Sequence, residues 1–240
     1  MDSPLTTHHS SVSVTPPSDH IKRTMSHQEP ERYKVAFGLA KEKLLQSDIR
    51  ERCAKSGATY NSAENLIEIP FMDRTCRIHL PDGTFDPLED GTDLRLSEQI
   101  LILHYLSTAS GVPLSNEVIT FGQIPDGTFY VPAFRRRSID WLVGVFGRKP
   151  DALLEAAKCL GGCPAEYGDV AVRFQVFPRV PMTFVLWRGD DEFPPSGNVL
   201  FDSTISQYLP TEDVAVLAGM LVSKLCKAQS SLTCSGADAE

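Results

Sequence analysis

Three strand-like runs near the carboxyl end of the chain limit its possible folds more than any other feature. Residues 170–177, 182–187 and 199–201 are rich in β-branched and aromatic side chains, and turn-forming residues separate them. Neighbouring strands with such short connections pair in antiparallel fashion, because a parallel pair needs a long crossover. We therefore expect a hairpin between the second and third runs, with a loop at 188–198.

The rest of the chain mixes helical and strand-like patterns. Apolar residues recur at helical spacing in several segments, and short alternating runs lie between them. The expected helices cover 30–54, 96–110, 137–146, 150–160 and 211–225, and the further expected strands cover 58–60, 65–69, 75–80, 118–121 and 128–131. These elements do not follow a strict βαβ order. They predict an α+β fold with a mixed or mainly antiparallel sheet packed against helices in a single domain.

The two ends of the chain differ in composition from the segment between them. Residues 1–29 are rich in Ser, Thr, His and Pro with few large apolar side chains, and residues 228–240 are similar. Such segments cannot bury enough apolar surface to offset their chain entropy. We expect disordered tails at 1–29 and 228–240 around one domain at 30–227.

Charge and cysteine content narrow the class of protein. Acidic residues outnumber basic ones 31 to 23, for a net charge of -8, which disfavours general binding to nucleic-acid phosphates. No apolar stretch approaches the roughly 20 residues that span a bilayer. The start of the chain lacks the basic and apolar regions of a secretory signal. We therefore expect a cytoplasmic protein without membrane attachment, whose six cysteines are reduced thiols.

A run of carboxylates follows the second strand-like run, which is the first strand of the predicted hairpin. Asp190, Asp191 and Glu192 stand in its loop, and Asp202 follows the third strand-like run. If the two strands are adjacent, Asp190 or Asp191 could lie near Asp202, and clustered carboxylates bind hard cations such as Mg²⁺. The alternative is a solvated turn with Phe193 tucked into the core. The sequence leaves both interpretations open.

Three consecutive arginines stand out in this acidic chain. Arg135, Arg136 and Arg137 lie just ahead of the third predicted helix, where backbone N–H groups favour anions. A phosphate or carboxylate group could dock there. Alternatively, the guanidinium groups pair with the acidic loops of the chain itself.

The cysteines and histidines give weaker signals. Cys159 and Cys163 are close in sequence, but iron–sulfur and zinc sites need further ligands, and no second pair is present. We expect all cysteines to be thiols and His79 and His104 to be core or boundary residues. The Walker A, G-x-G-x-x-G, G-x-S-x-G and H-E-x-x-H motifs are absent, so no common enzyme class is indicated. The sequence identifies neither a cofactor nor a catalytic residue, and it predicts no metal ligand set.

A longer pattern of motifs spans 161–213. It comprises Gly161-Gly162, Tyr167-Gly168-Asp169, Phe177 to Pro181, the string W-x-G-D-x-E-F-P from Trp187 to Pro194, L-F-D at 200–202, and Tyr208 to Asp213. The pattern resembles a domain-of-unknown-function family found mainly in anaerobic bacteria and archaea, and we expect the resemblance to extend over 30–226. It implies a link with corrinoid and one-carbon metabolism. Some relatives carry an added amino-terminal iron–sulfur domain, whereas this chain has no cysteine before Cys53.

These observations favour a binding or accessory protein. We expect it to hold a small anionic ligand or cofactor, a tetrapyrrole among the candidates, between the segment Arg135–Arg137 and the loop Trp187–Phe193. Trp187 and Phe193 would offer apolar faces, and the arginines would contact anionic groups. The alternative is a metal-dependent enzyme that uses the carboxylates Asp190, Asp191, Glu192 and Asp202. A module that binds only a partner protein is the third possibility.

Overall fold

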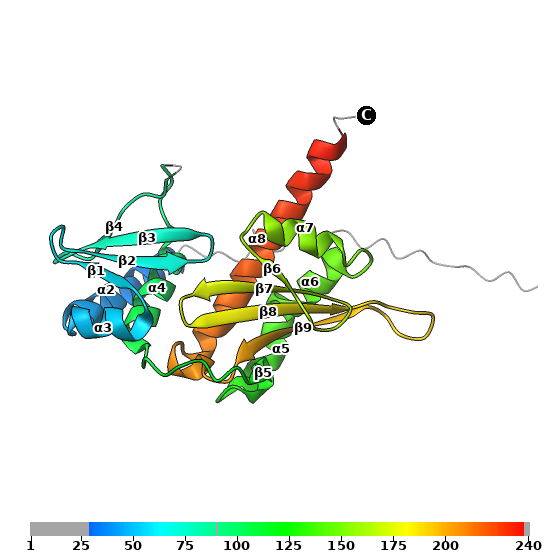
Figure 1. Ribbon diagram of the computed structural model, residues 1–240, viewed down its shortest axis with the longest axis horizontal. Helices are drawn as coiled ribbons and strands as arrows, with labels where there is room; N and C mark the ends of the chain where they lie inside the picture. The colour runs from blue at the N-terminus through cyan, green and yellow to red at the C-terminus, as the bar shows by residue number, and fades with distance from the viewer. Residues whose placement is uncertain (1–28, 90, 238–240) are drawn as a thin grey trace, which may run out of the picture.

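The computed structural model describes residues 29–89 and 91–237 and has the predicted α+β architecture of helices packed on antiparallel sheets (Figure 1). The helices are α2 (Glu29–Leu45), α3 (Ile49–Ser56), α4 (Leu96–Thr108), α5 (Gly127–Arg137), α6 (Ile139–Phe146), α7 (Ala152–Lys158) and α8 (Thr211–Ala237). The strands are β1 (Thr59–Asn61), β2 (Leu66–Phe71), β3 (Arg74–His79), β4 (Thr84–Phe85), β5 (Val118–Thr120), β6 (Cys163–Ala165), β7 (Val170–Phe177), β8 (Val180–Trp187) and β9 (Ser196–Asp202).

The carboxyl-terminal part of the chain forms a five-stranded sheet in the order β5-β9-β8-β7-β6. The predicted hairpin is confirmed: Trp187 pairs with Ser196 at the loop end, and Met182 pairs with Phe201 near the other end. The connecting loop covers only 188–195, because β9 begins three residues earlier than expected. β6 was not predicted, since its three residues, Cys-Pro-Ala, carry no strand-like alternation.

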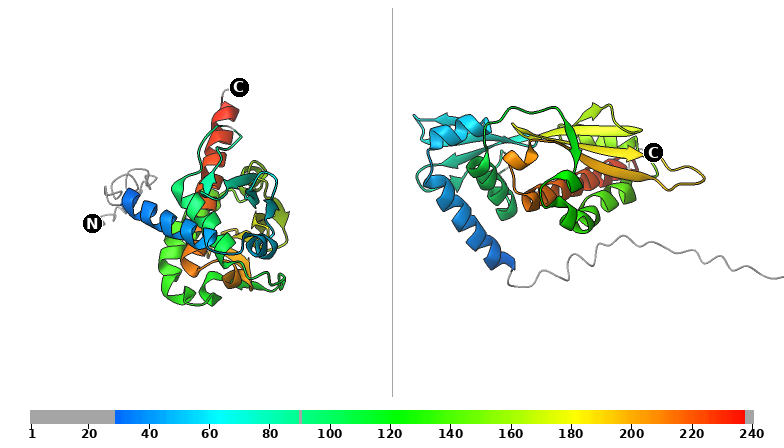
Figure 2. Two further views of the ribbon diagram at one scale, coloured as in Figure 1. Left: turned by 90° about the vertical axis from the view of Figure 1, so that its left-hand side faces the viewer. Right: turned by 90° about the horizontal axis from the view of Figure 1, so that it is seen from below.

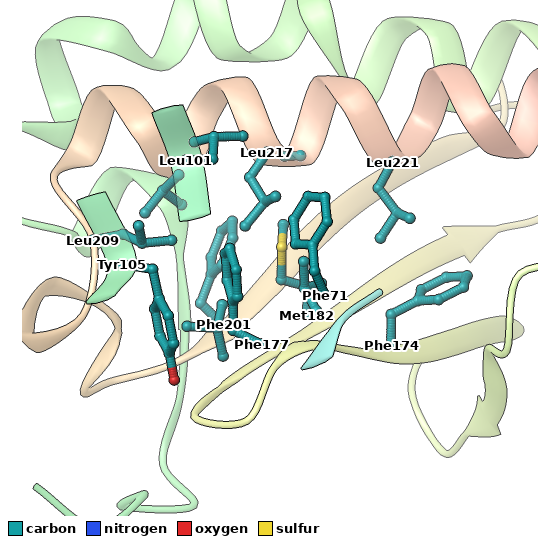
Figure 3. Packing of buried hydrophobic residues seen from close by; sticks show 14 of the residues in the cluster. Phe71, Leu101, Tyr105, Phe174, Phe177, Met182, Phe201, Leu209, Leu217 and Leu221 are labelled. Carbon is teal, nitrogen blue, oxygen red and sulfur yellow. The ribbon is translucent and has the colours of Figure 1, made fainter. Parts of the chain in front are cut away.

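Helices cover one face of this sheet. Seen from below, α5, α6 and α8 lie on the same side of β7, β8 and β9 (Figure 2). Alternate residues of the strands point toward α8, so that Phe174, Met182 and Phe201 meet Leu217 and Leu221 in the core (Figure 3). This packing buries the apolar stripe that the sequence shows in the last helix.

The amino-terminal part of the chain forms a four-stranded sheet in the order β1-β2-β3-β4. It adjoins the five-stranded sheet through β2 and the turn that follows it. The Met72 N–H donates to the Val176 carbonyl at 2.8 Å, and the rings of Phe71 and Phe177 lie 5.0 Å apart. A single hydrophobic core therefore includes residues of both sheets.

Tyr105 of α4 lies at this junction. Its ring stacks on Phe177 at 4.2 Å, with an angle of 7° between the planes. The hydroxyl donates to the Ser56 carbonyl at 2.6 Å and accepts from the Arg179 N–H at 3.1 Å. Burial raises the pKa of Tyr105, so the hydroxyl keeps the proton that it donates.

Two expected boundaries of the helices were wrong. The predicted helix over 30–54 is divided into α2 and α3, because the Asp48 side chain accepts a hydrogen bond from the Glu51 N–H and begins a new helix. Gly57 ends α3 in the left-handed conformation, as expected. The last helix continues from Leu225 to Ala237, through much of the predicted carboxyl-terminal tail. The predicted tail at 1–29 lies outside the described residues except for Glu29.

The expected strand at 128–131 was also wrong. Residues Thr128 to Val131 have high β propensity, but they belong to α5. The Phe134 ring, one turn further along α5, stacks on Phe121 at 4.0 Å in the core. We attribute the helix to this tertiary contact, which outweighs local propensity.

Removing the Tyr105 hydroxyl tests its role at the junction. Tyr105→Phe leaves the Ser56 carbonyl and the Arg179 N–H without their buried partner, which costs about 1–3 kcal/mol of unfolding free energy. We expect a lower midpoint of urea denaturation. The matched control is Tyr130→Phe, at a side chain 47 % exposed, which leaves the midpoint unchanged. Equal midpoints for both variants would contradict this role.

Candidate functional site

The carboxylates of the hairpin loop lie on a solvated turn. Asp190, Asp191 and Glu192 are exposed, and one Asp190 oxygen accepts hydrogen bonds from the N–H groups of Phe193 (2.7 Å) and Glu192 (2.9 Å). These two bonds hold the pKa of Asp190 below its ordinary value. The Asp190 carboxylate therefore stabilises its own turn. This agrees with the interpretation of the carboxylate run as a solvated turn, not as a cation site.

Asp202 does not lie near that loop. It stands at the opposite end of β9 from Ser196, and six residues of strand at about 3.4 Å each separate the two ends by roughly 20 Å. The predicted convergence of Asp190 or Asp191 with Asp202 is therefore wrong. Within the described residues, no three His, Cys, Asp or Glu side chains could together hold a metal ion.

Asp202 instead accepts five hydrogen bonds at the start of the β9–α8 connection. They come from the backbone and hydroxyl groups of Ser115 (3.2 and 3.0 Å) and Thr204 (3.0 and 2.6 Å) and from the Asn116 N–H (2.8 Å). The side chain is 8 % exposed. Burial alone would raise the pKa of this carboxyl, but the hydrogen bonds outweigh it and hold the pKa below its ordinary value.

The aromatic residues of the loop are exposed as well. Trp187 is 40 % and Phe193 is 67 % exposed, so the expectation that Phe193 reaches the core was wrong. The loop is anchored instead by Arg188, whose guanidinium donates to both Asp151 oxygens at 2.9 Å and whose N–H donates to Asp169 at 2.7 Å. These contacts leave the apolar faces of Trp187 and Phe193 toward solvent.

The arginine segment lies away from the hairpin loop. Arg135, Arg136 and Arg137 form the last turn of α5, and the eight residues of α6, about 12 Å long, follow them. The loop meets the far end of α6, where Pro195 lies against Gly147. The arginines and the loop Trp187–Phe193 therefore lie toward opposite ends of α6, and a site between them stays a prediction. Arg135 contacts Asp140 at 3.8 Å, and neither Arg136 nor Arg137 pairs with the two acidic loops within the described residues.

A large cavity lies elsewhere, along one side of α8. Its volume is about 610 Å³, within the usual range of 300–1,000 Å³ for small-molecule sites. The wall is formed by α8, the start of α4, the segment before α4, β3 and Tyr33 of α2. We call it the basic cavity, because its lining includes the cationic residues Arg74, Arg95, Lys224 and Lys227 and the acidic residues Asp93 and Glu98.

The charges of the basic cavity are only partly neutralised by the protein. Lys224 pairs with the buried Glu98 at 3.2 Å, and Arg74 contacts Asp73 at 3.2 Å. Arg95 and Lys227 have no ion pair in the described part of the chain. A surplus of positive charge in a concave site attracts anions, although the chain as a whole carries -8.

A second cavity of about 470 Å³ adjoins the first and shares Val216 and Ser223 with it. Its floor is the small-residue surface of α8 around Gly219, and its sides are Trp141, Arg136 and Arg137. We call it the apolar cavity. Two of the three predicted arginines, Arg136 and Arg137, thus line a cavity. The other residues of its lining come from α6 and α8, and none comes from the hairpin loop.

Sequence reasoning missed Arg74, Arg95, Lys224 and Lys227. Lys224 and Lys227 are three residues apart near the end of the apolar stripe of α8, so a basic helix face could have been read from the sequence. Arg74 and Arg95 come from a strand and a loop far earlier in the chain. Nothing local indicates that they meet α8.

The predicted state of the cysteines and the predicted place of two histidines can be compared with the structure. Cys53, Cys76 and Cys226 are free, and burial raises the pKa of each thiol to about 11, so they stay protonated at neutral pH. Cys159 and Cys163 are free and exposed. His104 contacts Asp213 at 2.7 Å and His79 contacts Asp86 at 2.7 Å. Each imidazole thus has a single carboxylate partner and a place at the boundary of the core.

Comparison with known proteins places the chain in a family. Residues 48–224 match the model of a domain of unknown function, DUF3786, and the chain belongs to that family. No curated protein and no solved structure matches the chain. None of the described helices is both long and apolar enough to cross a membrane.

Neutralising Asp202 tests whether it supports the fold. Because the folded-state pKa is lowered, ionised Asp202 stabilises the protein above the ordinary pKa of 3.8, and that contribution is lost as the pH falls below it. Asp202→Asn loses a charged acceptor and should cost about 1.5–3 kcal/mol at pH 7, measured by urea denaturation. As the pH falls below 3.8, the free energy of unfolding should also decrease less for the variant than for the wild type. The control, Asp191→Asn on the exposed loop, should behave as the wild type.

Proposed function

We propose that this protein binds a small organic anion in the basic cavity beside α8. The observation that supports this most directly is the lining of the cavity: it includes four cationic residues and two acidic ones, and Arg95 and Lys227 have no acidic partner in the described part. Unpaired cations in a cavity of this size suit a ligand with carboxylate or phosphate groups.

The adjoining apolar cavity extends the proposal to the shape of the ligand. Trp141 and the surface around Gly219 offer an apolar wall directly beside the basic cavity, and Arg136 and Arg137 stand at its side. A flat apolar body with acidic substituents would place the body on Trp141 and the acidic groups on the cations. A tetrapyrrole is one such ligand, and the association with corrinoid and one-carbon metabolism remains part of this proposal.

We place the protein in the cytoplasm and assign it a binding or accessory role. Cys53, Cys76, Cys159, Cys163 and Cys226 are free, which suits a reducing compartment. The predicted carboxylate ligands of a metal-dependent enzyme do not converge, so we do not carry that alternative forward.

Two probes test the proposal with the full chain. Protoporphyrin IX has a flat apolar body and two carboxylates, whereas pyrophosphate has only anionic groups. We expect the double variant Arg95→Gln, Lys227→Gln to weaken binding of both probes at least about tenfold, because charged hydrogen bonds contribute about 1.5–3 kcal/mol. Trp141→Leu should weaken only the porphyrin. Calorimetry measures both affinities.

The matched control is Lys149→Gln, at an exposed lysine outside both cavities. It should bind both probes as the wild type does. If the double variant and the control gave the same affinities, the basic cavity would not be the anion site. Circular dichroism of each variant shows that a change in affinity does not come from unfolding.

A further inference from the structure

The other face of the five-stranded sheet carries a separate cavity of about 90 Å³. Its lining includes Arg173 of β7, Thr183 of β8 and Asp202 of β9. Arg173 is the register partner of Thr183, so the two side chains lie on the same face of the sheet. Their neighbours in sequence, Phe174 and Met182, point the opposite way, into the core under α8 (Figure 3).

Thr183 is the first notable feature of this cavity. The residue is 7 % exposed, and its hydroxyl forms no hydrogen bond with another residue that the structure describes. The hydroxyl is not among the fully buried atoms without a partner, so it meets the cavity and is free to contact a ligand there.

The second feature is a pair of opposite charges that do not neutralise each other. Arg173 is exposed and forms no ion pair with a described carboxylate, although Asp202 lines the same cavity. One Asp202 oxygen, Oδ1, already accepts four hydrogen bonds, from Ser115 and Thr204. The other, Oδ2, accepts only the Asn116 N–H at 2.8 Å and keeps capacity for another donor.

We propose that this cavity binds a small hydroxy acid or amino acid, with its carboxylate on Arg173 and its hydroxyl or ammonium group on Asp202 Oδ2. Thr183 lies on the β8 strand between these two charged residues and would contact the middle of the ligand. A guanidinium group favours a carboxylate through paired N–H donors. A volume of about 90 Å³ equals roughly three waters of the liquid, which limits the ligand to a few heavy atoms.

This site is independent of the one beside α8. The basic cavity and the small cavity share no lining residue: the first lies beside α8 and is lined by no residue of the five-stranded sheet, and the second lies on the strands of that sheet. A ligand could occupy either without touching the other. Failure of one proposal therefore leaves the other standing.

Titration of the full ¹⁵N-labelled chain with four small probes tests the proposal. Glycolate and glycine carry both the carboxylate and the donor, acetate carries only the carboxylate, and methylammonium carries only the donor. We expect glycolate or glycine to shift the amide signals of Arg173 and Thr183 and to bind at least about fivefold more tightly than acetate. Methylammonium should bind more weakly still. Equal affinity for acetate and both bifunctional probes, or no shift at these amides with any probe, would overturn the proposal.

Two variants separate a ligand contact from a structural role. Arg173→Gln should weaken the tighter probe about tenfold or more, as expected for loss of a charged hydrogen bond. The matched control Arg148→Gln, at an exposed arginine outside the described cavities, should leave binding unchanged. Thr183→Val should weaken binding and leave the midpoint of urea denaturation without ligand unchanged, because the hydroxyl bonds no described residue. Unchanged binding, or a lower midpoint that shows the hydroxyl to serve the fold, would overturn the proposal.

Discussion

The stacked pair Tyr105–Phe177 is the interaction on which the arrangement of the two sheets depends. Its rings lie 4.2 Å apart, and Phe71 of the four-stranded sheet packs on Phe177 from β2. The Tyr105 hydroxyl adds contacts to the end of α3 and to the β7–β8 turn. Parts of the chain that are 74 residues apart are joined by one buried side chain, because an aromatic ring with a polar end can fill a core and satisfy backbone groups at once.

Helix α8 contributes to both the core and the candidate site. One side of it packs against the five-stranded sheet, and another side lines the two cavities. Leu217 and Leu221 pack under the five-stranded sheet (Figure 3). Val216 and Ser223, on another side of the helix, are shared by the basic and apolar cavities. A helix fixed by its buried stripe holds its other faces rigidly, which is what a preorganised binding site requires. The site and the core are thus built on the same element.

Asp202 shows how strand length separates residues that look adjacent in a motif. The loop carboxylates and Asp202 belong to one compact string of sequence, but β9 runs between them and carries them roughly 20 Å apart. Asp190 holds a turn, and Asp202 joins the segment before β5 to the segment after β9. The same extension places Asp202 at the small cavity, across the sheet from Arg173.

The sequence by itself determined the antiparallel hairpin, the α+β class and most helices, since hydrophobic periodicity and turn residues are local signals. It also indicated the arginine segment, of which Arg136 and Arg137 line a cavity. It did not determine that 128–131 is helical, because the Phe121–Phe134 stack outweighs local β propensity. Nor did it determine the basic cavity, since Arg74, Arg95 and Lys224 come from three separate elements. Only the tertiary structure decided their meeting, because the packing of α8 and α4 against both sheets sets distances between residues that no local pattern encodes.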